Sequence, residues 1–206
     1  MDKELLLQLL PYLESANDGT AQGNYLQELA NDETQEGICL NLVLTWMLLY
    51  KRENSTKAPN VIWQEMKTPA MIKQIANNQR AYQNMVGNGI NKIQDSATFL
   101  GLDANEWVIF KEATEIIPLM DITLRHTPMN LICIHLYKDG KCAGGHAIGA
   151  IMHTVGNANK LYLFDPNVGV MQAPYASKDE LLNKIAYIYE TYFGYNIGGE
   201  YIFEIV

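Results

Sequence analysis

The stretch that decides the fold is residues 36–50, which read EGICLNLVLTWMLLY. From residue 40 onward only Asn41 and Thr45 are polar, so a helix built from this stretch is apolar on nearly every side. A helix of that kind lies inside a domain rather than on its surface. The stretch therefore predicts a central helix over 38–51, with the other elements packed around it.

Cys39 falls in the first turn of this helix. The backbone N–H groups of a first turn have no helical partners, and the positive end of the helix dipole lies there as well. Both lower the pKa of a thiol and make the thiolate available near pH 7. A cysteine beside a run of leucines is also commonly a small core residue. The catalytic interpretation requires a base elsewhere in the chain and a group to orient that base, whereas the core interpretation requires neither.

The composition of the chain limits the classes of protein to which it can belong. The chain has 206 residues, of which 48% are hydrophobic and 18% charged, which predicts one globular domain over 1–206. The net charge of −8, without a run of Lys and Arg, argues against a nucleic-acid partner. No uninterrupted apolar run reaches about 18 residues, so no membrane span is expected. Three cysteines without paired spacing predict no disulfide framework.

The first half of the chain is predicted to be helical. A first helix covers 3–14. The polar stretch that follows is predicted to be a loop or a mobile segment. Residues 1–35 thus form a helical or mobile lead-in ahead of a core over 36–206. After the central helix, Thr68 is the N-cap of a helix that runs from Pro69 to about Met85, and a further helix covers 90–100 and is ended by Gly101.

The second half is predicted to be an antiparallel sheet. Asp139-Gly140 is the turn signal of a hairpin between strands 131–137 and 145–153. Further strands are expected at 107–110, 161–165, 168–172 and 201–206, with a helix over 112–124 and an amphipathic helix after a capping box of Ser177 and Glu180, whose apolar face extends to Tyr189. Helices first and a strand meander later predict an α+β fold, with the central helix packed on the sheet.

Strand alternation places His146 on one face and Gly149 on the other, where the small residue leaves room for the Cys39 helix. Asp165 ends the neighbouring strand, so its carboxylate is expected to bind one imidazole nitrogen of His146 while the other faces the thiol. The alternatives are a satisfied core histidine and an ordinary Asp-Pro-Asn turn.

The other histidines and cysteines are weaker candidates for a catalytic role. His126 reads as a loop residue, His153 lies at a strand exit, and His135 reads as a core residue or a buried polar one. Cys142 has no partner at disulfide or zinc spacing. Without a Cys-x-x-Cys or His-Glu-x-x-His motif, neither a metal site nor a cofactor is predicted.

Two segments carry a resemblance to a known family. GGHAIGA over 144–150 and LYLFDPNVG over 161–169 resemble the His and Asp motifs of the YopT-type cysteine proteases, bacterial effectors of the papain-like clan. Gly37-Ile38-Cys39, with Trp46 two turns on, is similar to the nucleophile segment of that family. The resemblance in organisation covers roughly residues 35–206.

The resemblance implies a papain-like fold and a catalytic triad. Cys39 would be the nucleophile, His146 the general base and acid, and Asp165 the orienting carboxylate. It also implies a protein substrate, in particular a host protein, no cofactor, and secretion by a specialised bacterial system with action in the host cytoplasm. Papain-like sites add a side-chain amide shortly before the cysteine to the oxyanion hole; Gln35 is the nearest such amide here, and we expect it to act beside the Cys39 N–H.

Two other functions stay open at this point. Glutamine deamidases, acyl transferases and isopeptidases among bacterial effectors use the same Cys-His-Asp apparatus, so fold and triad do not fix the substrate. A catalytically silent domain on the same scaffold, binding a partner protein, is the alternative of a different class.

Overall fold

The computed structural model describes residues 38–111, 115–116, 119, 123–124 and 126–206. The expected helix over 3–14, the rest of the lead-in, Gln35 and most of the expected helix over 112–124 lie outside the described residues. The division into a lead-in and a core stays a prediction.

Among the described residues, four helices precede the sheet: α3 (Cys39–Arg52), α4 (Pro59–Met66), α5 (Pro69–Gln83) and α6 (Gly89–Leu100). The predicted central helix is confirmed as α3, whose residues from Leu40 to Tyr50 are all buried except Leu49. The predicted cap of α5 is also confirmed, since the Thr68 side chain accepts a hydrogen bond from the Met71 N–H at 3.3 Å.

Helix α4 was not predicted from the sequence. It has eight residues and begins at Pro59, whose fixed φ suits the first helical position. Three of its apolar side chains, Ile62, Trp63 and Met66, are buried. Its brevity hides the 3.6-residue period that reveals a longer helix.

In the part of the chain that the structure describes, the sheet has six antiparallel strands in the order β1-β6-β2-β3-β4-β5. The strands are β1 (Ala104–Ile109), β2 (Met129–Lys138), β3 (Lys141–Val155), β4 (Ala158–Asp165), β5 (Gly169–Pro174) and β6 (Asn196–Ile205). The predicted hairpin is confirmed: Lys138 pairs with Lys141, and Asp139 and Gly140 both have positive φ, as a type I′ turn requires. The last strand, β6, is inserted between β1 and β2.

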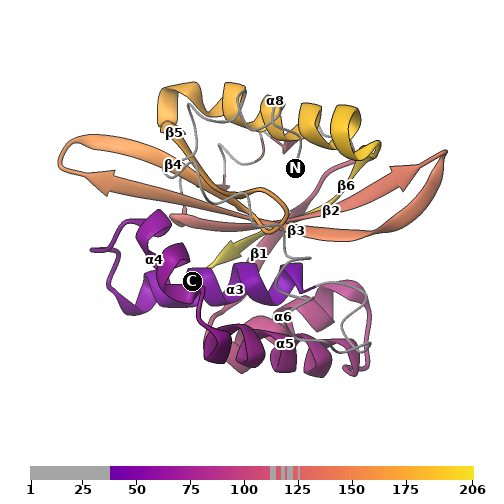
Figure 1. The fold of residues 1–206 in the computed structure, drawn as a ribbon, viewed down its shortest axis with the longest axis horizontal. Coiled ribbons are helices and arrows are strands. Elements are labelled where there is room, and N and C mark those ends of the chain that lie inside the picture. The colour runs from indigo at the N-terminus through magenta and orange to yellow at the C-terminus, as the bar shows by residue number, and fades with distance from the viewer. Residues whose placement is uncertain (1–37, 112–114, 117–118, 120–122, 125) are drawn as a thin grey trace.

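Helices cover both faces of the sheet (Figure 1). Helices α3 to α6 lie on one face, and α8 (Lys178–Ile188) lies on the other. Alternate residues of β3 enter two separate cores: Ala147 and Ile151 pack with α3, whereas Ile148 and Ala150 pack with α8. The predicted α+β arrangement, a cysteine-bearing central helix on an antiparallel sheet, is confirmed.

The predicted capping box at the start of α8 is wrong. Ser177 is the N-cap residue, but in the described structure its side chain makes no capping hydrogen bond. Ser177 also ends a 3-10 turn over Tyr175–Ser177, and its φ of −106° and ψ of 16° are not the extended conformation that aims a capping hydroxyl at the helix.

Among the residues described, no helix is long and apolar enough to cross a membrane.

Candidate active site

Cys39 is the first residue of α3, and it is half-buried and lines a cleft. The backbone N–H groups of Leu40 and Ala147 both donate to its sulfur, and its side chain is hydrogen-bonded to His146. Ala147 belongs to β3, so the thiol lies where the start of the helix meets this strand. The sequence predicted Cys39 in the first turn, and the sheet supplies two further partners of its sulfur, His146 and Ala147.

Two opposing effects act on the pKa of the Cys39 thiol. Burial raises it, because a thiolate is poorly solvated away from water. The hydrogen bond from His146, the charge on its ring and the two backbone N–H groups lower it, and together they outweigh burial. The net result is a pKa below the ordinary value of a cysteine, so that the thiolate is available.

His146 and Asp165 lie together, as the sequence predicted. The pairing of β3 with β4 ends at Gly149 and Phe164, so Asp165 stands where β4 stops and His146 lies on β3 beyond that point. His146 Nε2 donates to Asp165 Oδ1 at 3.1 Å, and both side chains are buried. Since Nε2 is bound to the carboxylate, Nδ1 is the ring nitrogen left for the Cys39 sulfur.

The pKa of His146 is raised to about 10. Burial lowers it, but the negative charge of Asp165, the hydrogen bond to that carboxylate and the contact with Cys39 raise it by more. A raised histidine pKa beside a lowered cysteine pKa is the condition for a thiolate–imidazolium pair.

Asp165 has further partners that the sequence did not indicate. Its Oδ1 accepts the backbone N–H of Asn167 at 2.8 Å, and the Tyr189 hydroxyl is 2.9 Å from Oδ2 and 3.2 Å from Oδ1. The Asn167 side chain in turn donates to the Tyr189 oxygen at 3.1 Å. Burial and the charge of Asp165 raise the pKa of Tyr189 well above 10, so the phenol stays protonated and donates to the carboxylate.

Tyr189 reaches this position through an irregular helix. Helix α8 is followed by the single π-helical turn η4 (Tyr189–Phe193), which ends at Gly194 with a φ of 69°. The sequence pattern assigned Tyr189 to the apolar face of a regular α-helix. A 3.6-residue period carries no signal for a π-turn, so the role of its hydroxyl was missed.

The cleft in front of the thiol has a volume of about 290 Å³. Besides Cys39, His146 and Ala147, its lining includes Gln79, Tyr82, Cys133, His135 and Gly145. Of the described residues that line it, none is Asp, Glu, Lys or Arg. Apart from His135 and His146, the cleft therefore presents apolar and uncharged polar groups beside the Cys39 thiol.

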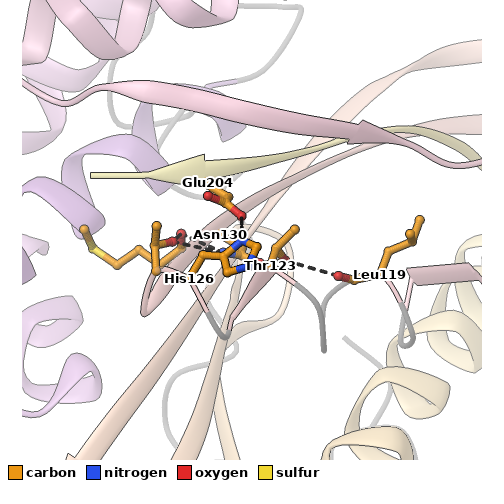
Figure 2. Close-up of polar contacts among 7 residues, drawn as sticks. Leu119, Thr123, His126, Asn130 and Glu204 are labelled. Atoms are coloured by element: carbon orange, nitrogen blue, oxygen red, sulfur yellow. Dashed lines mark hydrogen bonds and ion pairs between the residues drawn. The ribbon is translucent and has the colours of Figure 1, made fainter.

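The other histidines that the sequence singled out lie in different settings. His135 lines the cleft. His153 is buried, with Nδ1 hydrogen-bonded to the Tyr50 hydroxyl at 3.0 Å. His126 lies in a turn, as predicted, and its Nδ1 is 3.0 Å from Glu204 Oε1 on β6 (Figure 2). In the same view Thr123 is bonded to Asn130 and to the Leu119 carbonyl.

All three cysteines lie within the described chain and are free thiols: Cys39 half-buried, Cys133 buried and Cys142 exposed. The described residues contain no group of three or more His, Cys, Asp or Glu side chains placed to hold a metal ion. Gln35 lies outside the described residues, so its predicted part in an oxyanion hole stays untested.

Fold and site together define an α+β protein in which a thiol that lines a cleft contacts an imidazole, and the imidazole contacts a buried carboxylate. Among solved structures, the chain is similar to the Pseudomonas avirulence protein AvrPphB, with a TM-score of 0.59. The likeness covers 84% of this chain and 94% of that one at 13% sequence identity, and it shows the fold alone. No protein-family model matches the sequence, and no curated protein matches it.

Proposed function

We propose that this chain is a cysteine protease that hydrolyses a peptide bond in a protein substrate. Cys39 is the nucleophile, His146 the general base and acid, and Asp165 the carboxylate that orients His146. The observation that carries the proposal is the continuous contact from the Cys39 thiol through the His146 ring to Asp165. The motif resemblance to the YopT-type proteases and the papain-like fold support it.

The first half of the reaction forms an acyl-enzyme. The Cys39 thiolate attacks the peptide carbonyl carbon, a C–S bond forms, and the carbonyl π electrons move onto oxygen. When this tetrahedral species collapses, the C=O bond is restored and the C–N bond breaks. His146 gives its proton to the departing nitrogen, so an amine leaves and a thioester remains.

The second half releases the acyl group. Neutral His146 takes a proton from water as the water oxygen attacks the thioester carbon. Collapse of this second tetrahedral species breaks the C–S bond and returns the electron pair to sulfur. The carboxyl product departs, and the thiolate and the protonated imidazole are restored.

The proposal includes a setting for this activity. The family that the sequence motifs resemble consists of bacterial effectors, and the fold is similar to a protein whose name marks it as an avirulence protein. Both support a bacterial effector delivered by a specialised secretion system to act on a protein in the host cytoplasm.

The test of the thiol chemistry is the rate at which limiting iodoacetamide alkylates each cysteine, assigned by mass spectrometry across a pH series. Exposed Cys142 and buried Cys133 serve as internal references. We expect Cys39 to react fastest below pH 7 and to lose that advantage in His146→Ala, because the imidazolium stabilises its thiolate. His126→Ala, which removes an exposed histidine outside the cleft, should leave the advantage intact. A Cys39 that reacts no faster than Cys142 would overturn the proposal.

The products separate peptide hydrolysis from the related reactions of the same apparatus. Incubation with a mixture of host-cell proteins should yield new polypeptide ends that Cys39→Ala does not produce. Release of ammonia without new ends would identify a glutamine deamidase instead, and a new covalent amide between proteins would identify an acyl transferase.

A further inference from the structure

Acyl chemistry at Cys39 places negative charge on a carbonyl oxygen, and this charge needs fixed hydrogen-bond donors. The Cys39 backbone N–H is one such donor, because the first N–H groups of a helix have no partner within it. The N–H groups that follow are already used: Leu40 donates to the sulfur, and Asn41 donates to Gln79. Since the N–H groups that follow Cys39 in the helix are engaged, a side-chain amide beside the first turn is the next source of a second donor.

Gln79 lies against this first turn although it belongs to another helix, α5. Its Oε1 accepts the Asn41 backbone N–H at 3.4 Å and the Asn41 side-chain amide at 2.9 Å. Gln79 is only 5% exposed, and it lines the same cleft as Cys39 and His146. The Gln79 amide thus contacts Asn41, which comes two residues after Cys39 in the sequence.

The orientation of the Gln79 amide follows from its partners. A backbone N–H can only donate, so the Gln79 atom that faces Asn41 must be the oxygen. Asn41 is itself held from the other side, where the Ser96 hydroxyl contacts its Oδ1 at 3.5 Å. The Gln79 Nε2 therefore points away from Asn41, and within the described chain it has no hydrogen-bond partner.

We infer that Gln79 Nε2 is the side-chain donor of the oxyanion hole, acting together with the Cys39 backbone N–H. The inference rests on the proposed function and names a further catalytic residue for it. As the C–S bond forms and the π electrons move onto the carbonyl oxygen, both N–H groups donate to that oxygen. When the C=O bond is restored the leaving group departs, and Gln79 neither gains nor loses a proton.

The position of Gln79 explains why the sequence did not reveal it. The motif directs attention to an amide shortly before the cysteine, where Gln35 is the nearest candidate. Gln79 comes 40 residues after Cys39 and reaches it only because α5 packs on α3.

The test compares two reactions of the same thiol. Acylation of Cys39 by p-nitrophenyl acetate, followed as release of p-nitrophenolate, passes through an oxyanion and needs no protonation of its leaving group. Alkylation of Cys39 by iodoacetamide forms no oxyanion. The ratio of the two rate constants therefore reports the oxyanion hole separately from the state of the thiolate.

The diagnostic variant is Gln79→Glu, which keeps an acceptor for Asn41 and removes the donor. We expect its acylation-to-alkylation ratio to fall on the order of 10²-fold, as when other enzymes lose one oxyanion donor. The matched control is Gln74→Glu, which makes the same charge change at an exposed position of α5 outside the cleft. This control should keep the wild-type ratio.

If thermal unfolding shows that Gln79→Glu does not fold, the ratio is measured in Gln79→Met instead, because methionine has a similar volume and no donor. A wild-type ratio in the folded Gln79 variant would overturn the inference, and so would an equal fall in both rates. A wild-type protein whose Cys39 is not acylated at all would overturn the proposed function and the inference with it. Acylation of the wild type together with an unchanged ratio in the variant overturns the inference alone.

Discussion

At the scale of the residue, the site depends on the hydrogen bonds that the buried Asp165 carboxylate accepts. A buried carboxylate is costly unless its oxygens accept hydrogen bonds. Asp165 accepts them from His146, the Asn167 backbone and the Tyr189 hydroxyl, so both of its oxygens have donors. These contacts hold the carboxylate against the His146 ring, where its negative charge stabilises the imidazolium.

Tyr189→Phe tests this account of the carboxylate. The substitution removes a hydrogen bond to a charged, buried group, so we expect the free energy of unfolding to fall by about 2 kcal/mol. Urea unfolding followed by circular dichroism measures the change. Tyr187→Phe removes a hydroxyl from an exposed side chain of α8, two residues before Tyr189, and should change the free energy far less. Equal effects of the two variants would contradict a special role for the Tyr189 hydroxyl.

The residues of the site were predictable to different extents. Cys39, His146 and Asp165 lie at a helix start, on a strand and at a strand end, and local pattern locates such places well. Gln79 and Tyr189 reach the site through helix packing and through a π-turn, and neither leaves a local signal. The sequence therefore indicates the proposed reacting groups better than the groups that support them.

At the scale of the element, the contact between α3 and β3 sets the position of the thiol. A Cβ atom on Gly149 would lie 2.9 Å from both Val43 and Trp46, closer than real contacts allow. The glycine therefore lets the helix approach the strand closely enough for the Ala147 N–H to reach the Cys39 sulfur.

Gly149→Ala should therefore affect both stability and reactivity. Overpacking of this kind costs about 1–3 kcal/mol, and a displaced α3 should slow alkylation of Cys39. Urea unfolding and iodoacetamide labelling measure the two effects. Gly145→Ala on the same strand is the control for stability, because its new methyl would meet nothing nearer than 4.0 Å. A Gly149→Ala protein with wild-type stability and labelling would show that the helix does not depend on this close approach.

The helices and turns that have strong local signals in the sequence were predicted correctly. The apolar run of α3, the Thr68-Pro69 start of α5 and the Asp139-Gly140 turn were each found where predicted. Insertion of β6 between β1 and β2 is a long-range pairing, and the pattern of one strand carries no information about its neighbours.

At the scale of the whole molecule, the sheet separates two cores, and the candidate site lies where β4 stops short along β3. The helical layer contributes Cys39 and Gln79, while the strands contribute His146 and Asp165. Because the layers must stay packed for these groups to meet, a group that joins the layers elsewhere should influence the stability of the whole. His153 is such a group, since it lies on β3 and bonds Tyr50 on α3.

The stability of the molecule should therefore depend on pH through His153. Burial and the nearby charge of Lys160 lower the pKa of His153 below its ordinary value of 6.5, so the unfolded chain takes up a proton before the folded one does. The contribution of His153 to stability is present above pH 6.5 and is lost as the pH falls from there through the lowered pKa. Urea unfolding at about pH 8 and about pH 5 should show a larger loss of stability in the wild type than in His153→Gln, which cannot titrate. An equal loss in wild type and His153→Gln would mean that the folded protein accepts the proton on His153 as readily as the unfolded chain does.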